Sequence, residues 1–131
     1  MMIVRNTVIP FWGFIAITLW PFVFVRRQTW TQFTNNVLRH ERIHGHQQVE
    51  MLLVGAVAAA ILAVLGCEWW SLLALPLFFW LYGMEWLLGL FCFGNSKEAY
   101  RNISFEREAY DNELDVDYLK KRRPFASFRY L

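Results

Sequence analysis

The stretch between Arg42 and Lys97 contains no lysine and no arginine. Two apolar runs fill most of it, at residues 51–66 and 69–93, and only two residues separate them. A helix needs about 20 apolar residues, within a range of about 17–25, to cross the hydrocarbon core of a bilayer. The first run reaches that length only when flanking residues join it, and the second is long enough when tilted. We therefore expect a predominantly α-helical, integral membrane protein built on a hairpin of two transmembrane helices.

The composition favours a membrane protein over a soluble one. The chain has 131 residues, enough for a single domain, of which 56% are hydrophobic and 18% are charged. Soluble domains carry about 25% charged residues, and a small body cannot bury so much apolar surface. A soluble protein with two buried core helices remains the alternative. The net charge of +2 gives no indication of a nucleic-acid partner. The apolar composition instead makes the lipid bilayer the expected partner.

The basic residues predict which way the hairpin faces. They cluster at its two open ends, namely Arg26, Arg27, Arg39 and Arg42 before it and Lys97, Arg101 and Arg107 after it. The turn between the two apolar runs carries none of them. Because basic residues are retained on the cytoplasmic side of a membrane, we expect both open ends in the cytoplasm and Glu68 of the turn outside.

The N-terminal segment, residues 8–25, is uncharged and by length could form a third span. Pro10, Gly13 and Pro21 are unsuited to a helix interior, whereas its many Phe, Ile, Val and Trp residues favour strands. We expect short β-strands lying at the membrane face, with a third span as the alternative.

The composition becomes polar after the second apolar run. Residues 104–123 are rich in helix formers and predict one polar helix. Ser104 is the expected N-cap, and Pro124 is expected to end the helix.

The motif that carries chemistry is His-Glu-Arg-Ile-His at residues 40–44, an H-E-x-x-H pattern. Residues four apart share one face of a helix, so His40 and His44 can both bind one Zn²⁺. Glu41 lies beside them, where it can take a proton from a metal-bound water. The Thr34-Asn35-Asn36 segment offers caps for such a helix.

A catalytic zinc site needs a third protein ligand. His46 and Glu50 are out of phase with the two motif histidines on a helix. The remaining candidates lie on the polar helix after the hairpin: Glu106, Glu108, Asp111 and Glu113. Because the motif helix enters the hairpin and the polar helix leaves it on the same side, these carboxylates can lie beside the histidines.

The chain resembles the gluzincin metallopeptidases, in which a glutamate on a later helix completes the HExxH site. It looks more closely like a group of small uncharacterised bacterial membrane proteins that pair HExxH with a downstream F-E-x-E-A-Y segment. The resemblance is carried by residues 36–48 and 102–112, and it extends to residues 13–17, the pair Glu85-Trp86 and residues 124–126.

This resemblance implies that Glu106 is the third ligand, beside His40 and His44, and that Glu41 is the catalytic base. It also implies the inner (cytoplasmic) membrane of a bacterium, and the basic open ends of the hairpin predict that the site faces the cytoplasm. Many membrane gluzincins have an aspartate four residues after the glutamate ligand, where it orients a histidine. This chain has Tyr110 at that position.

The departure at Tyr110 leaves the supporting carboxylate open, with Asp111 and Glu85 as candidates. Glu113 with Asp117 fits the same spacing and is the alternative ligand pair.

Glu85 is a functional candidate in its own right, because an ionisable group inside an apolar span is costly. It is expected to bond a metal-bound histidine or to line a water-accessible cavity. A protonated glutamate near the membrane interface is the alternative. Gln47 and Gln48 share the metal-binding face by helical phase and are candidate hydrogen-bond donors to the site.

The leading hypothesis is an integral membrane zinc metallopeptidase that cleaves a peptide or protein substrate. The apolar strands at residues 11–25 are expected to present that substrate by edge pairing. The alternatives are a non-catalytic membrane zinc-binding protein and a metal-free protein that recruits a partner through its C-terminal helix.

Overall fold

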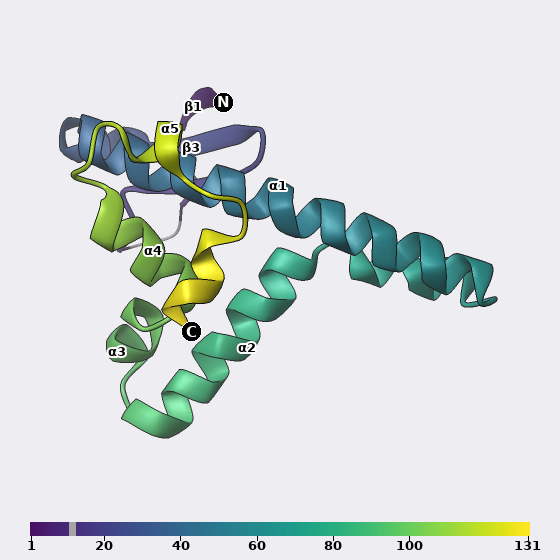
Figure 1. Cartoon of the computed structure of the whole chain (residues 1–131). Helices are drawn as coiled ribbons and strands as arrows, with labels where there is room; N and C mark the ends of the chain where they lie inside the picture. The colour runs from purple at the N-terminus through teal and green to yellow at the C-terminus, as the bar shows by residue number, and fades with distance from the viewer. Residues whose placement is uncertain (11–12) are drawn as a thin grey trace.

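The computed structural model describes residues 1–10 and 13–131, which are mostly helical with one small sheet (Figure 1). The strands are β1 (Met2–Asn6), β2 (Ala16–Leu19) and β3 (Phe22–Arg26). The α-helices are α1 (Asn35–Val64), α2 (Leu77–Phe93), α3 (Ser96–Arg101), α4 (Ser104–Asn112) and α5 (Tyr118–Lys121). Three 3₁₀ helices complete the described elements: η1 (Arg27–Gln32), η2 (Glu68–Ala74) and η3 (Ala126–Tyr130).

The N-terminal segment forms strands, as its composition predicts, and the described part contains no third membrane helix. The strand order is β1-β3-β2, with β2 antiparallel and β1 parallel to β3. Val23 and Val25 of β3 are fully buried and pack against Trp30 and Phe33. Phe11 and Trp12, at the start of the predicted strand region, lie outside the described residues. The sheet therefore leaves β2 as an edge strand beside α1.

The HExxH motif and the first apolar run form one continuous helix, α1, of 30 residues. Thr34 is the N-cap, and its side chain accepts a hydrogen bond from the Val37 amide, as the sequence predicts. The first half of α1 is largely buried, whereas Val57 and Ile61 in the second half are 62% and 57% exposed. The second half extends away from the sheet and α4 (Figure 1).

The second apolar run is broken into η2 and α2, which are bent by 62° relative to each other. Pro76 lies at the break as the N-cap of α2, and it has no N–H with which to continue the preceding helix. η2 folds back closely along α1. The closeness is seen at Gly55 of α1, which lies directly against the Ala74 carbonyl. The second apolar run is therefore not one straight helix, since only η2 follows α1 and α2 turns toward α3.

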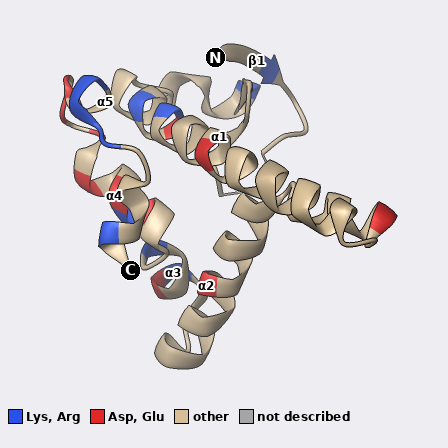
Figure 2. Cartoon of the chain, turned by 45° about the vertical axis from the view of Figure 1, so that its right-hand side comes forward, with Lys and Arg blue, Asp and Glu red and all other residues tan. Residues whose placement is uncertain are grey.

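By length and composition, α1 is the one described helix that could cross a membrane, and η2 with α2 would add a second if the bent pair is a single span. Figure 2 shows most charged residues around the sheet, the first half of α1 and the segment from α3 onward, whereas residues 51–64 of α1 carry no charge.

The predicted polar helix is shorter than expected, since α4 ends at Asn112 and α5 begins at Tyr118. Between them, the Asp115 carboxylate accepts a hydrogen bond of 3.0 Å from the Asp117 amide, a turn that competes with helix continuation. Ser104 is not the N-cap either, because Ile103 occupies that position.

A small apolar core joins the three helices that build the site. Met51 of α1, Phe78 of α2 and Phe105 of α4 are all buried there, together with Ile103. Their contacts hold α4 against the first half of α1, so the hairpin does bring the motif helix and the later polar helix together.

Candidate metal centre

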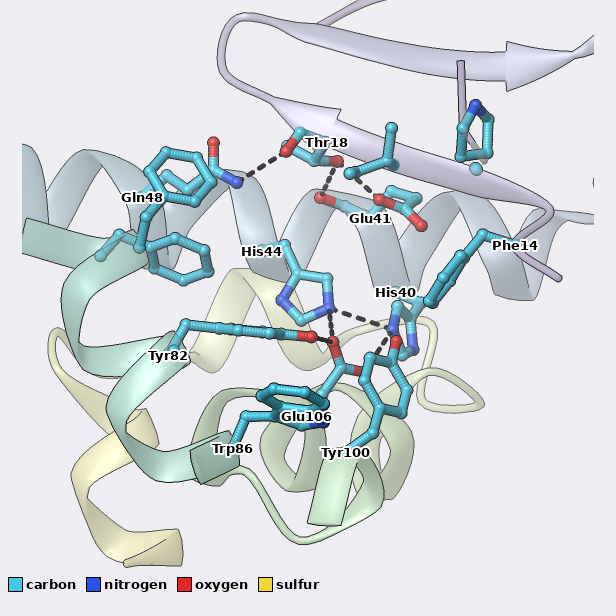
Figure 3. A pocket seen from close by; sticks show the side chains of 16 residues that line it. Phe14, Thr18, His40, Glu41, His44, Gln48, Tyr82, Trp86, Tyr100 and Glu106 are labelled. Carbon is cyan, nitrogen blue, oxygen red and sulfur yellow. Dashed lines mark hydrogen bonds and ion pairs between the residues drawn. The ribbon is translucent and has the colours of Figure 1, made fainter. Parts of the chain in front are cut away.

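His40, His44 and Glu106 converge in one buried cluster (Figure 3). The two histidines lie on successive turns of α1, and Glu106 lies in the first turn of α4. The His40 Nε2 and His44 Nε2 atoms are 3.1 Å apart. They lie 3.3 Å from Glu106 Oε2 and 3.2 Å from Glu106 Oε1, respectively. This is the set of three ligands that the resemblance implies.

The separations are compatible with a tetrahedral metal ion. Zinc binds histidine nitrogen and carboxylate oxygen at about 2.0–2.2 Å, so ligand atoms in tetrahedral geometry lie about 3.3–3.6 Å apart. The two nitrogens are 3.1 Å apart, and each lies 3.2–3.3 Å from its nearer Glu106 oxygen, Oε2 for His40 and Oε1 for His44. The side chains can therefore hold an ion with little movement.

The hydrogen bonds of the histidines leave both Nε2 atoms without a proton of their own. His40 Nδ1 lies 2.9 Å from Glu113 Oε2, and His44 Nδ1 lies 2.7 Å from Gln47 Oε1. Both partners are acceptors, so we assign each Nδ1 the proton and each Nε2 a lone pair. Glu106 Oε2 is likewise buried without a hydrogen-bond partner. Three lone-pair donors thus face one another, which is the arrangement that a cation satisfies.

The electrostatics of Glu106 describe the site without a cation. Burial opposes its ionisation, but the charge of His44, which is protonated in that state, and the contacts with both histidines lower its pKa well below the ordinary value. A bound cation would replace that proton and supply the positive charge in its place. Glu106 is therefore a carboxylate at neutral pH, the form that binds a metal.

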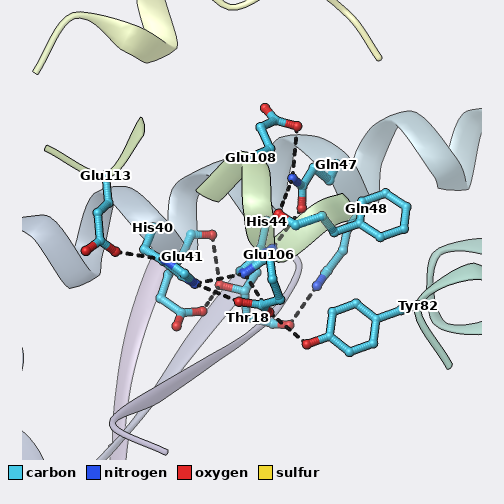
Figure 4. A network of polar contacts seen from close by, with 11 residues as sticks. Thr18, His40, Glu41, His44, Gln47, Gln48, Tyr82, Glu106, Glu108 and Glu113 are labelled. Atoms are coloured by element: carbon cyan, nitrogen blue, oxygen red, sulfur yellow. Dashed lines mark hydrogen bonds and ion pairs between the residues drawn. The ribbon is translucent and has the colours of Figure 1, made fainter. Parts of the chain in front are cut away.

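A second layer of side chains holds these ligands in place (Figure 4). Glu113 accepts from His40, and Gln47 accepts from His44. The Tyr82 hydroxyl donates a hydrogen bond of 2.7 Å to Glu106 Oε1. The ring of Tyr110 packs edge-on against His40, with centroids 4.7 Å apart. Most metal-bound histidines have a hydrogen-bond acceptor on the ring nitrogen that does not bind the metal, and Glu113 and Gln47 are in that position here.

Two of the predicted supporting residues are elsewhere. The Glu85 carboxylate accepts from the Ser104 amide at 2.6 Å and from the Ser104 hydroxyl at 2.8 Å. It therefore caps the N-terminus of α4 rather than bonding a histidine. Asp111 is exposed, and Glu113 takes the role expected of it.

The alternative ligand pair is not assembled. Glu113 contacts the outer nitrogen of His40, and Asp117 pairs with Lys120 on the surface, at 2.8 Å. His46 is exposed on another face of α1, as its phase predicts. Glu50 and Glu108 are engaged with Arg122.

The motif glutamate is held by the edge strand. Thr18 Oγ1 of β2 lies 2.8 Å from Glu41 Oε2 and 3.0 Å from the Glu41 carbonyl oxygen. Gln48 fixes the same strand: its Nε2 donates to the Thr18 carbonyl, and its Oε1 accepts from the Trp20 amide, both at 2.8 Å. Gln48 thus supports the strand rather than the metal ligands. Thr18 is a functional candidate that the sequence analysis missed, since a single threonine in an apolar segment carries no local signal.

A pocket of about 370 Å³ opens between β2, α1, α2 and α4, within the size range of ligand sites. His40, Glu41, His44 and Glu106 form its polar part, and its other walls are mainly apolar and aromatic, with Ile17, Phe79 and Trp86 among them. Figure 3 shows Glu41 on the strand side of the pocket and Glu106 on the opposite side. The candidate ligands and the candidate base thus share one accessible space.

Comparison of the chain with family models, with curated proteins and with solved structures finds no match. The function proposed below therefore depends on the geometry of the site itself.

Proposed function

We propose that this chain is an integral membrane zinc metallopeptidase, as the resemblance to gluzincins implies. The observation that carries the proposal is the buried triad of His40, His44 and Glu106, which shares a pocket with Glu41. Structural zinc sites are closed by four protein ligands, whereas catalytic sites have three and keep one position open. Within the described residues the cluster has three members, which favours catalysis over a purely structural role.

The residues of the pocket have distinct parts in peptide hydrolysis. His40, His44 and Glu106 would hold a zinc ion, which acidifies a bound water and polarises a substrate carbonyl. Glu41 accepts the proton of the attacking water and then donates it to the leaving amine. Thr18 keeps the Glu41 carboxylate oriented through its hydroxyl contact. An extended peptide can pair with the edge strand β2 only before Thr18, because Gln48 binds the Thr18 carbonyl and the Trp20 amide.

We also propose that the apolar half of α1 lies in a bilayer, with both open ends of the hairpin in the cytoplasm. Only 22% of the apolar window of α1 is buried within the protein, and soluble proteins rarely expose apolar patches beyond a few hundred Å². The metal cluster lies at the start of the same helix. Its substrate is therefore expected close to the cytoplasmic membrane surface.

Metal content is the first test. Elemental analysis of the detergent-purified protein should find about one zinc ion per chain, since the three ligands form one cluster. His44→Ala should abolish the bound zinc, whereas His46→Ala should retain it, because His46 is an exposed histidine on another face of the same helix. Equal zinc in both variants, or no zinc in the unmodified protein after reconstitution, would contradict the metal site.

Glu41→Gln separates catalysis from metal binding. The variant should keep its zinc and lose at least about a hundredfold in hydrolysis of a mixed fluorogenic peptide library, the scale of a lost general base. The non-catalytic alternative predicts that Glu41→Gln changes neither zinc content nor hydrolysis. Undiminished zinc-dependent hydrolysis by this variant would remove Glu41 from the mechanism.

A further inference from the structure

A line of buried polar contacts runs from His44 to the C-terminal segment of the chain. Gln47 is fully buried, and its Oε1 lies 2.7 Å from His44 Nδ1. Its Nε2 donates to the Phe105 carbonyl and to Glu108 Oε2, both at 3.0 Å. Figure 4 shows His44, Gln47 and Glu108 in succession between α1 and α4.

These contacts fix which way the Gln47 amide points. A carbonyl and a carboxylate can only accept hydrogen bonds, so the NH₂ group of Gln47 must face Phe105 and Glu108. Its oxygen must then face His44, which places the proton of the imidazole on Nδ1 and leaves Nε2 free to bind a metal. The orientation of one buried amide therefore selects the metal-binding tautomer.

Glu108 is itself held by the C-terminal segment. It is fully buried, and its Oε1 accepts from the Tyr118 hydroxyl at 2.9 Å and from Arg122 Nε at 2.5 Å. The Arg122 side chain is 3% exposed and also pairs with both carboxylate oxygens of Glu50. A buried carboxylate that accepts hydrogen bonds from these donors has its orientation fixed.

We propose that Glu108, held by Arg122 and Tyr118, is a positioning residue for the metal site. It orients the Gln47 amide, and Gln47 in turn sets the tautomer of His44. The proposal rests on zinc binding by His40, His44 and Glu106, and it gives the segment after α4 a function in that site.

Glu108→Gln tests this link with almost no change in shape. Whichever way the new amide points, its NH₂ group faces an N–H group of Arg122 or the NH₂ group of Gln47. Rotation of Gln47 relieves the conflict between the two amides and turns its oxygen toward the Phe105 carbonyl, so the Gln47 amide loses the orientation preference that Glu108 gives it. The rotated Gln47 would present its own NH₂ to His44 Nδ1 and move the imidazole proton to Nε2, where it blocks the metal. We expect zinc affinity about 10–100-fold weaker, the usual effect of losing a residue that supports a ligand.

The measurement is the zinc dissociation constant of the full-length protein in detergent, by competition with a chromogenic chelator. Glu98→Gln is the matched control, because Glu98 is an exposed glutamate on α3, and its affinity should be unchanged. Gln47→Leu and the double variant complete the set. If Glu108 acts through Gln47, the double variant should bind zinc no more weakly than Gln47→Leu alone.

Each outcome decides between the two proposals. Unchanged zinc affinity in folded Glu108→Gln, or additive losses in the double variant, would overturn the positioning role and leave the metal site standing. A lack of zinc in the unmodified protein would overturn both. If Glu108→Gln does not fold, Tyr118→Phe removes one hydrogen bond to Glu108 and should weaken zinc binding a few-fold. No change in that variant would then overturn the positioning role.

Discussion

At the scale of single residues, the contacts of each glutamate decide its part in the molecule. Glu106 faces the two histidines, Glu41 faces a strand hydroxyl, and Glu113 accepts from the outer nitrogen of His40. Glu85 caps a helix. Four residues of one chemical type thus serve as candidate ligand, base, ligand support and structural cap.

The support by Glu113 gives a prediction of its own. Glu113→Gln replaces a charged acceptor by a neutral one, so His40 becomes a weaker ligand and zinc affinity should fall about tenfold. Chelator competition measures the change. Asp111→Asn removes a nearby charge from an exposed site and should leave the affinity unaltered. An equal loss in both variants would point to a general charge effect instead.

The sequence predicts some of these residues and not others, for a physical reason. His40 and His44 follow from helical periodicity alone, and the hairpin topology correctly brings Glu106 within reach of them. The roles of Glu113 and Glu85 depend on where the chain turns after α4 and on how α2 crosses it, which local patterns do not determine. Gln47 was recognised by helical phase as facing the site, but its acceptor role depends on α4.

At the scale of elements, the helical content and the strand segment were predictable, and the path of the second apolar run was not. Hydropathy reports that residues 69–93 are apolar, and Pro76 marks where a break can occur. The 62° bend depends on the close packing of η2 against α1, a contact between segments that composition does not encode.

That packing can be tested at two glycines. A Cβ at Gly55 would lie 2.2 Å from the Ala74 carbonyl oxygen, whereas a Cβ at Gly83 in α2 meets nothing within 4 Å. Gly55→Ala should therefore lower the free energy of unfolding by about 1–3 kcal/mol, as overpacking does. Gly83→Ala should be neutral or stabilise by up to about 1 kcal/mol, because alanine favours helix. Denaturation in detergent measures both, and equal stability of the two variants would contradict the close packing.

At the scale of the whole molecule, charge and apolar surface are separated. Most charged residues lie in the sheet, in the first half of α1 and in the segment from α3 onward, whereas residues 51–64 of α1 carry none (Figure 2). The proposed membrane orientation follows from this separation and from the absence of basic residues in the turn.

The two native cysteines allow that orientation to be tested. Cys67 lies in the turn after α1, and both cysteines are free thiols. In a Cys92→Ser background, a membrane-impermeant maleimide should label Cys67 in intact spheroplasts. In a chain without either native cysteine, Lys97→Cys should be labelled only after permeabilisation, because the open ends are expected inside. The reverse pattern would invert the orientation, and recovery of the chain in the soluble fraction would contradict a membrane span.

The candidate metal ligands lie on either side of the apolar hairpin in the sequence, with His40 and His44 before it and Glu106 after it. During synthesis, the ribosome completes both apolar runs before it adds Glu106. A nascent chain can hold an ion with two histidines at most until α4 has emerged. If the site binds its metal as proposed, full loading is therefore a late event in biosynthesis, after the hairpin has been translated, and a chain truncated within the hairpin would lack the complete site.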